Sequence, residues 1–202
     1  MLLDIVIYGD PVLREKGLPV KEVTPELRKL ADDMLETMRA ANGVGLAAQQ
    51  IDVPLQLAVV DVSHDPECIS YLRINGEDAD LAENMPLVFT NPVIHGSKDR
   101  ETDVEGCLSF PDLRYDIRRP AEITATLTLI DGRTITLETD GLLSRAIQHE
   151  TDHLNGILFI DRVSSAAKLG LKRKIKRIQE DYGTRLTLEH PTGGEEENQA
   201  PA

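Results

Sequence analysis

The sequence lacks the features that direct a chain to a membrane or out of the cell. None of its apolar runs approaches the roughly 20 residues that a membrane-spanning helix needs. Asp4 interrupts the first apolar run, which is short, and a secretory signal would carry basic residues there. Cys68 and Cys107 are too few and too far apart to form a disulfide framework. We therefore expect a soluble protein of the cytosol.

Positive charge is also scarce, since 22 lysine and arginine residues face 35 aspartate and glutamate residues, giving a formal net charge of -13. This balance argues against docking on an anionic membrane and against a surface broadly suited to nucleic acid. The exception is a predicted amphipathic helix at 166–182, whose basic face is either solvated or a local partner site. Its apolar face contains Leu171, Ile175, Ile178 and Tyr182, and its basic face Lys172, Arg173, Lys174, Lys176 and Arg177.

Length and a hydrophobic content of 41% indicate one domain, which we place at residues 1–185, followed by a disordered acidic tail at 186–202. An acidic stretch at 63–85 is expected to form a surface excursion, and His95 to lie in a loop. The patterns further predict two helices, one from Thr24-Pro25 to Asn42-Gly43 and one between Thr139-Asp140 and Asn155-Gly156. They predict strands near 1–7, at 55–60 and at 87–90, the last ended by Asn91-Pro92. They also predict a hairpin of 123–129 and 134–138 around a two-residue turn, Asp131-Gly132.

This last helix contains the motif around which the chain is organised, His149-Glu150-Thr151-Asp152-His153. Two histidines four residues apart lie on one face of a helix, so both imidazoles can reach one metal ion. In the H-E-x-x-H pattern the glutamate is not a ligand but takes a proton from a water that the metal polarises. The helix is otherwise so apolar that we expect it to run through the centre of the protein. The motif alone lacks a third ligand.

Cys107 lies between Gly106 and a turn that ends at Pro111, so the backbone would hold the thiol rigidly. From these residues alone, a buried apolar cysteine, a nucleophile paired with a histidine, and a metal ligand all remain open. His64 and Cys68 lack regular metal-ligand spacing and are interpreted as loop residues.

The segment 43–50, GVGLAAQQ, superficially fits the dinucleotide fingerprint G-x-G-x-x-A. That fingerprint needs a strand before it and a helix after it. Here a predicted helix precedes the segment and a predicted strand follows it, which argues against nucleotide binding.

Three stretches taken together, GVGLAAQQ at 43–50, EGCLS at 105–109 and QHETDH at 148–153, resemble the peptide deformylase family. Members of this family remove the formyl group from new bacterial polypeptides. The resemblance covers roughly residues 1–183, with the three motifs in the family's order. It implies an α+β fold in which antiparallel β-sheets pack around a central helix carrying H-E-x-x-H, with an N-terminal and a C-terminal helix.

The resemblance implies that Cys107, His149 and His153 bind one divalent metal and leave a fourth position for water, as in open catalytic sites. The family metal is generally Fe²⁺, although Zn²⁺, Ni²⁺ or Co²⁺ can occupy the site. Glu150 would accept the proton of the attacking water and pass it to the departing amine. The Leu108 backbone N–H and the Gln50 side-chain amide would stabilise the oxyanion.

The same resemblance implies how an N-formylmethionyl peptide would bind. Gly45 and Gly106 would bracket the extended peptide backbone, and Arg114 would lie near the peptide. Val44, Leu142, Arg145 and Ala146 would border the methionine pocket. Because Arg145 is charged, we expect its stem to line the pocket and its guanidinium to turn outward. Asp152 is expected to support the second histidine or to be satisfied locally.

Two other functions share parts of this pattern. A zinc endopeptidase also uses H-E-x-x-H, but its third ligand is usually a downstream glutamate or histidine. A non-catalytic relative that binds formylated peptides would not need Glu150 and Gln50, and both are present. The absence of a transit peptide favours the bacterial cytoplasm, and the basic helix at 166–182 could dock on the ribosome.

Overall fold

The computed structural model describes residues 1–65, 70–163 and 165–189. The α-helices of this part are α1 (Pro25–Ala40), α2 (Gly141–Leu154) and α3 (Ser165–Tyr182), and its short 3-10 helices are η1 (Pro11–Arg14), η2 (Ala48–Ile51), η3 (Ala82–Asn84) and η4 (Phe159–Arg162). Its strands are β1 (Ile5–Val6), β2 (Gly45–Ala47), β3 (Leu57–Val60), β4 (Leu72–Ile74), β5 (Glu77–Asp78), β6 (Leu87–Gly96), β7 (Arg100–Cys107), β8 (Phe110–Pro120), β9 (Ile123–Leu129), β10 (Thr134–Thr139) and β11 (Arg185–Leu186).

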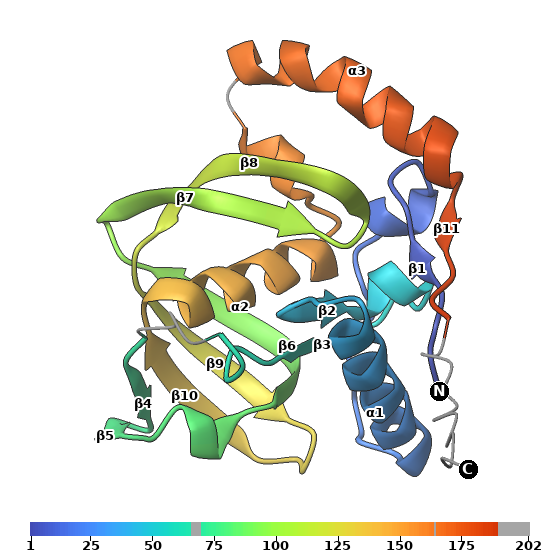
Figure 1. The fold of residues 1–202 in the computed structure, drawn as a ribbon. Coiled ribbons are helices and arrows are strands. Elements are labelled where there is room, and N and C mark those ends of the chain that lie inside the picture. Colours follow the sequence, from blue (N-terminus) through green and yellow to red (C-terminus); the bar gives the residue numbers. More distant parts are fainter. Residues whose placement is uncertain (66–69, 164, 190–202) are drawn as a thin grey trace, which may run out of the picture.

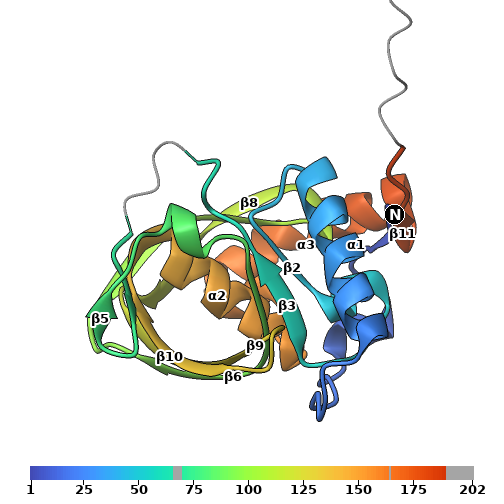
Figure 2. The same cartoon turned by 90° about the horizontal axis from the view of Figure 1, so that it is seen from below.

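The strands form an antiparallel framework around α2. A seven-stranded sheet of order β2-β3-β6-β9-β10-β4-β5 curves along one side of the helix, and the β7–β8 ribbon covers the other (Figures 1 and 2). Strands β1 and β11 form a separate pair beside α3. The predicted α+β fold around a central helix is therefore confirmed.

Helix α2 is central because most of its side chains are apolar or find polar partners inside the protein. Leu143, Ile147 and Leu154 are fully buried among side chains of the curved sheet. The predicted N-cap is only partly right, because the Asp140 carboxylate makes no cap bond and accepts instead from the Tyr71 N–H. The Ser70 hydroxyl accepts from Leu143 N–H at 3.3 Å, so the capping group comes from the segment before β4.

Strand β6 is longer than the sequence predicts. We expected Asn91-Pro92 to end the strand, but pairing with β9 resumes at Val93 and continues to Gly96. Asn91 takes a positive φ of 49°, and the register shifts there, so the proline lies in a bulge where its missing N–H is tolerated. His95 consequently lies in β6 opposite Thr124 and not in a loop.

Two further segments differ in detail from the prediction. In the β9–β10 hairpin, Leu129 N–H donates to Arg133 O, so three residues form the turn where two were expected. The acidic excursion contributes β4 and β5, which extend the edge of the seven-stranded sheet beyond β10. Cys68 lies outside the described residues, and His64 is exposed, 4.0 Å from an Asp61 oxygen.

The other predicted helices are confirmed. The Thr24 hydroxyl accepts from Leu27 N–H at the start of α1. In α3, Leu171 and Ile178 are buried in a cluster with η4 and β8, while the basic side chains 172–174, 176 and 177 are exposed. No helix in the described residues is both long and apolar enough to cross a membrane.

The last strand of the described residues reaches the predicted start of the tail. Leu186, which was expected to begin the tail, pairs with Ile5 in the β1–β11 sheet. Residues 190–202 of the predicted tail lie outside the described residues.

Candidate active site

The fold brings the three sequence motifs to one place. Strand β2 and η2 come from the first motif, the end of β7 supplies Cys107, and α2 supplies His149 and His153. The sulfur of Cys107 is 3.2 Å from Nε2 of His153, and the Nε2 atoms of the two histidines are 3.3 Å apart. All three potential ligand atoms lie within 4.8 Å of one another. One metal ion can contact all three.

The chemistry of this donor set fits a catalytic divalent metal. Nδ1 of His149 lies 3.1 Å from Oε2 of Glu105, so this carboxylate orients the ring and leaves Nε2 directed at Cys107 and His153. One thiolate and two imidazoles suit iron, zinc, nickel or cobalt, and three protein ligands leave a position for water. The predicted ligands are thus brought together.

Glu150 lies beside the ligands in a tightly enclosed position. Its residue is 4% exposed, and Oε2 has no hydrogen-bond partner within the described part of the chain. A Cβ at Gly45 would come closer than 3.0 Å to Oε1, so only glycine allows β2 to pass the carboxylate. Burial raises the pKa of Glu150 to about 7, although the positive charges of His149 and Arg119 oppose the rise. A carboxylate with this pKa suits proton transfer near neutrality.

Gln50 is oriented by its own short helix. Its Oε1 accepts from Ala47 N–H at 2.9 Å, which directs Nε2 toward Ser109 Oγ at 3.2 Å and Cys107 Sγ at 3.6 Å. Leu108 follows the cysteine, and its side chain lies against the backbone of Gly43. The amide of Gln50 and the cysteine loop are therefore adjacent, as the prediction for oxyanion donors requires.

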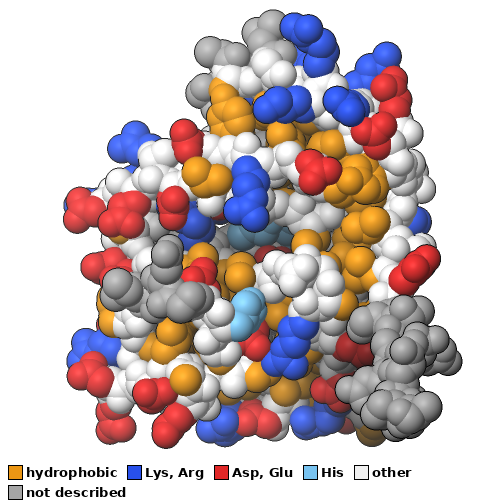
Figure 3. Space-filling model, in the orientation of Figure 1, with side chains coloured by type: hydrophobic (Ala, Val, Ile, Leu, Met, Phe, Trp, Pro, Cys, Tyr) orange, Lys and Arg blue, Asp and Glu red, His pale blue; other side chains and the backbone are white. Residues whose placement is uncertain are grey.

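The predicted substrate residues lie on the elements that carry the three motifs or directly beside them. Val44 and Leu142 are half-buried and pack against the cluster that contains Ala146. Gly106 pairs with Arg114 across the β7–β8 ribbon, and Arg114 is exposed. Figure 3 shows that this face is hollowed near its middle, with histidine colour at the floor and apolar side chains around the hollow.

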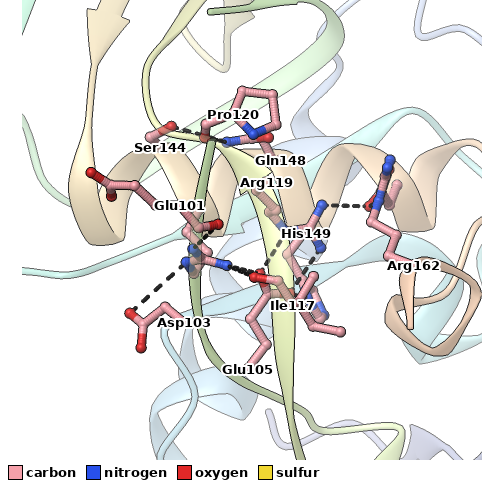
Figure 4. Close-up of polar contacts among 12 residues, drawn as sticks. Glu101, Asp103, Glu105, Ile117, Arg119, Pro120, Ser144, Gln148, His149 and Arg162 are labelled. Atoms are coloured by element: carbon pink, nitrogen blue, oxygen red, sulfur yellow. Dashed lines mark hydrogen bonds and ion pairs between the residues drawn. The ribbon is translucent and has the colours of Figure 1, made fainter. Parts of the chain in front are cut away.

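Arg145 does not behave as predicted. Its guanidinium was expected to turn outward, but the residue is 9% exposed and Nη1 donates to Glu105 Oε1 at 2.6 Å and to Ile117 O at 3.0 Å. Arg145 faces the buried carboxylate of Glu105, which gives the guanidinium a charged hydrogen-bond acceptor inside the protein. The charge therefore points toward Glu105 and Ile117 of the β7–β8 ribbon, which are both labelled in Figure 4.

A buried network of charges was not found from the sequence. Arg119 is 1% exposed and donates to both carboxylate oxygens of Glu105, at 2.6 and 2.8 Å, and to Asp152 at 2.7 Å. Arg162, labelled in Figure 4, also donates to Asp152 through Nε. Burial opposes the ionisation of Glu105, but hydrogen bonds from His149 and Arg119 outweigh it and lower its pKa. Asp152 thus supports the site through Arg119.

The signals that could have revealed this network were weak. Glu105 belongs to the cysteine motif and directly precedes Gly106, so its position was known but its role was not. Arg119 stands in the sequence Arg118-Arg119-Pro120, which resembles an exposed basic segment. Only the alternation of β8 distinguishes the buried Arg119 from the exposed Arg118.

The fold and the site define a class of protein, a metallohydrolase with an open coordination position and an adjacent buried carboxylate. The chain belongs to the polypeptide deformylase family, whose family model matches residues 2–169. It is accordingly an enzyme, a hydrolase.

Relatives and solved structures agree with this placement. The chain is 45% identical to a peptide deformylase of Methylacidiphilum infernorum over 89% of its own length and 94% of that protein. It is 46% identical to a peptide deformylase of Opitutus terrae, over 88% and 93%. Among crystal structures, the peptide deformylase of Ehrlichia chaffeensis superimposes with a TM-score of 0.76 at 32% identity, covering 90% of this chain and 98% of that one. A Synechococcus elongatus peptide deformylase in complex with actinonin gives 0.71 at 35%, covering 94% and 92%.

Proposed function

We propose that this chain hydrolyses the N-formyl group of peptides that begin with formyl-methionine, releasing formate and a free amine. The observation that carries the proposal is the convergence of Cys107, His149 and His153 with Glu150 and Gln50 in one buried site. Ligands, a proton acceptor and an amide donor are the parts that hydrolysis of a small amide requires.

The proposed mechanism assigns one task to each side chain. When bound by Cys107 and the two histidines, a divalent metal would polarise a water molecule and lower its pKa toward neutrality. Glu150 accepts the proton of that water as the water oxygen attacks the formyl carbon. Gln50 Nε2 and the Leu108 N–H donate to the developing oxyanion, and each such donor typically contributes about 3 kcal/mol. Glu150 then protonates the amine nitrogen as the C–N bond breaks.

Substrate binding would use the residues around the hollow. The backbone at Gly45 and Gly106 would pair with the extended peptide, because neither residue has a side chain to obstruct it. Val44, Leu142 and Ala146 would contact the methionine side chain, since they share one apolar cluster. Arg114, exposed on β8 opposite Gly106, would lie near later residues of the peptide.

Formate release tests the proposal directly. Anaerobically purified protein loaded with metal should release formate from a formyl-Met peptide, and Glu150→Ala should lose most of this turnover while still binding metal. General base catalysis typically contributes about 10²–10⁴-fold. Cleavage of an internal peptide bond would indicate the zinc endopeptidase, and binding without formate release the non-catalytic relative. Full activity of Glu150→Ala would refute the assigned role.

The identity of the metal is a finer proposal. We infer Fe²⁺ as the native ion, with Zn²⁺, Ni²⁺ or Co²⁺ able to replace it, because the mixed sulfur and nitrogen ligands accept all four. Metal analysis of protein purified without oxygen tests whether Fe²⁺ is the native ion. Formate release after reloading with each ion tests which of the others can replace it.

A partner is proposed for the exposed face of α3. Lys176 pairs with Glu180 and Arg177 with Asp181 along the helix, whereas Lys172, Arg173 and Lys174 are exposed ahead of them. We infer that these three side chains dock on ribosomal RNA in the bacterial cytoplasm, where formylated chains emerge. Changing all three to Gln should weaken cosedimentation with ribosomes and leave formate release from a short peptide intact. Equal cosedimentation would remove the idea.

A further inference from the structure

The guanidinium of Arg145 connects α2 to both strands of the β7–β8 ribbon. It donates to the Glu105 side chain on β7 at 2.6 Å and to Ile117 O on β8 at 3.0 Å, with a longer bond of 3.5 Å to Glu101 O (Figure 4). One turn further along α2, Gln148 Nε2 donates to Pro120 O at 3.1 Å. The side of α2 that faces the ribbon is thus fastened to it by polar contacts.

Glu105 is the centre of these contacts. Its Oε1 accepts from Arg119 Nε and Arg145 Nη1, both at 2.6 Å. Its Oε2 accepts from Arg119 Nη2 at 2.8 Å and lies 3.1 Å from His149 Nδ1. Arg119 shares its charge with Asp152, so Arg145 supplies the second positive charge next to Glu105. The carboxylate therefore stays ionised and held in one orientation.

The spacing along the chain gives this contact a geometric consequence. Cys107 lies two residues after Glu105 on the same strand, and His149 lies one helical turn after Arg145 on the same helix. A bond between residues 145 and 105 therefore fixes how far the sulfur ligand is from the imidazole ligand.

We propose that Arg145 is a positioning residue for the metal centre and not a wall of the methionine pocket. Its guanidinium holds the Cys107-bearing ribbon against the helix that carries both histidines, and it acts on His149 through Glu105. The inference rests on the proposed function only in taking Cys107, His149 and His153 as metal ligands.

The discriminating variant is Arg145→Met, which removes the guanidinium and retains an apolar stem. Glu105 keeps its paired bonds to Arg119, so it is not left buried without a partner. In competition with a chelator, the metal affinity of the variant should fall about 10–100-fold, the usual effect of losing an outer partner of a ligand. With Co²⁺, the thiolate-to-metal absorption band should lose intensity, because the sulfur is no longer held in place. At saturating metal, KM for a formyl-Met peptide should stay within about twofold.

Matched variants distinguish positioning from general damage. Arg145→Lys keeps a charge and one donor, so its metal affinity should lie between those of wild type and Arg145→Met. Arg133→Met removes an arginine that is 72% exposed and should change nothing. Circular dichroism tests whether each variant is folded. If Arg145→Met does not fold, the metal affinity of Arg145→Lys is compared with that of the wild type.

Unchanged metal affinity and an unchanged cobalt band in both Arg145 variants would overturn the proposal. A raised KM with normal metal affinity would also overturn it, because that result is expected if Arg145 lines the methionine pocket. The affinity and the cobalt spectrum do not depend on formate release. Failure of the proposed function would therefore be seen in the wild-type protein and would not be confused with failure of this inference.

Discussion

Helix α2 has two sides that are built differently. Toward the seven-stranded sheet it presents apolar residues such as Leu143, Ile147 and Leu154, which are fully buried. Toward the β7–β8 ribbon it presents polar residues, and each of these has a specific partner there or in η4. These residues are Arg145, Gln148, His149 and Asp152. The apolar side supplies burial, which tolerates small shifts, and the polar side supplies directional bonds, which do not.

The comparison teaches why the metal ligands lie where they do. Buried ion pairs contribute little net stability, because desolvation offsets their attraction, but they fix geometry when every partner is present. A site that must hold a sulfur and two nitrogen atoms within 4.8 Å needs such geometry. The apolar side of the helix supplies the burial that stabilises the element carrying both histidines.

Breaking the polar side at its centre should have the largest effect. Arg119→Met removes a guanidinium that is 1% exposed and leaves Glu105 and Asp152 buried with fewer partners. Removing one partner of a buried pair typically costs about 3–5 kcal/mol. Urea unfolding of the metal-free protein measures this loss. Arg133→Met, at an exposed arginine, should stay within about 0.5 kcal/mol of wild type.

Breaking the apolar side should reduce stability without disturbing the ligands. Ile147→Ala leaves a cavity between α2 and the curved sheet and should cost about 2–5 kcal/mol. Metal affinity of the folded protein should stay close to wild type, because Ile147 packs in the apolar cluster of the curved sheet and its replacement leaves the polar network in place. Urea unfolding measures the loss of stability, and chelator competition on the same sample measures the metal affinity. A large loss of metal affinity would show that the two sides are not independent.

The sequence predicted one of these sides far better than the other. The apolar residues of α2 and the pair His149 and His153 repeat with the helical period, so local pattern revealed them. Strands β7 and β8 were missed because almost every β7 residue is exposed and polar, which leaves no alternating pattern to detect. The partners Glu105 and Arg119 meet α2 only through that ribbon.

Single residues show the same limit. Pro92 is usually a reason to end a strand, and only the bulge at Asn91 allows β6 to continue. Arg145 was expected to turn outward because its partner on β7 could not be known from α2 alone. Cys107 was identified as a ligand through its resemblance to a family motif, since its own surroundings left three roles open.

A substitution at the edge of the site should affect catalysis more than stability. Gly45→Ala would place a Cβ against Oε1 of Glu150 and displace the carboxylate. Misplacement of a reacting group by about 1 Å can cost about 10²-fold in rate. We expect kcat for formate release to fall by this order while metal affinity is retained. Unchanged kcat would mean that Glu150 can move aside without loss of function.

The smallest effect is expected at an ion pair that belongs to neither side of α2. Asp61 accepts from Arg39 at 2.8 Å and from the Ser63 hydroxyl at 2.6 Å. Burial raises the pKa of Asp61, but these hydrogen bonds outweigh it and the net pKa lies below the usual 3.8. The lowered pKa means that the stabilisation is present above pH 3.8 and is lost as the pH falls through the folded-state pKa.

Asp61→Asn should therefore be less stable than wild type at neutral pH by about 1 kcal/mol, since Arg39 is half exposed and such pairs are weak. The difference should shrink as the pH is lowered below 3.8, where the wild-type carboxylate takes up its proton. Urea midpoints of both proteins across this range measure it. A difference that persists in acid would assign the effect to lost packing or to the amide and not to the charge of Asp61.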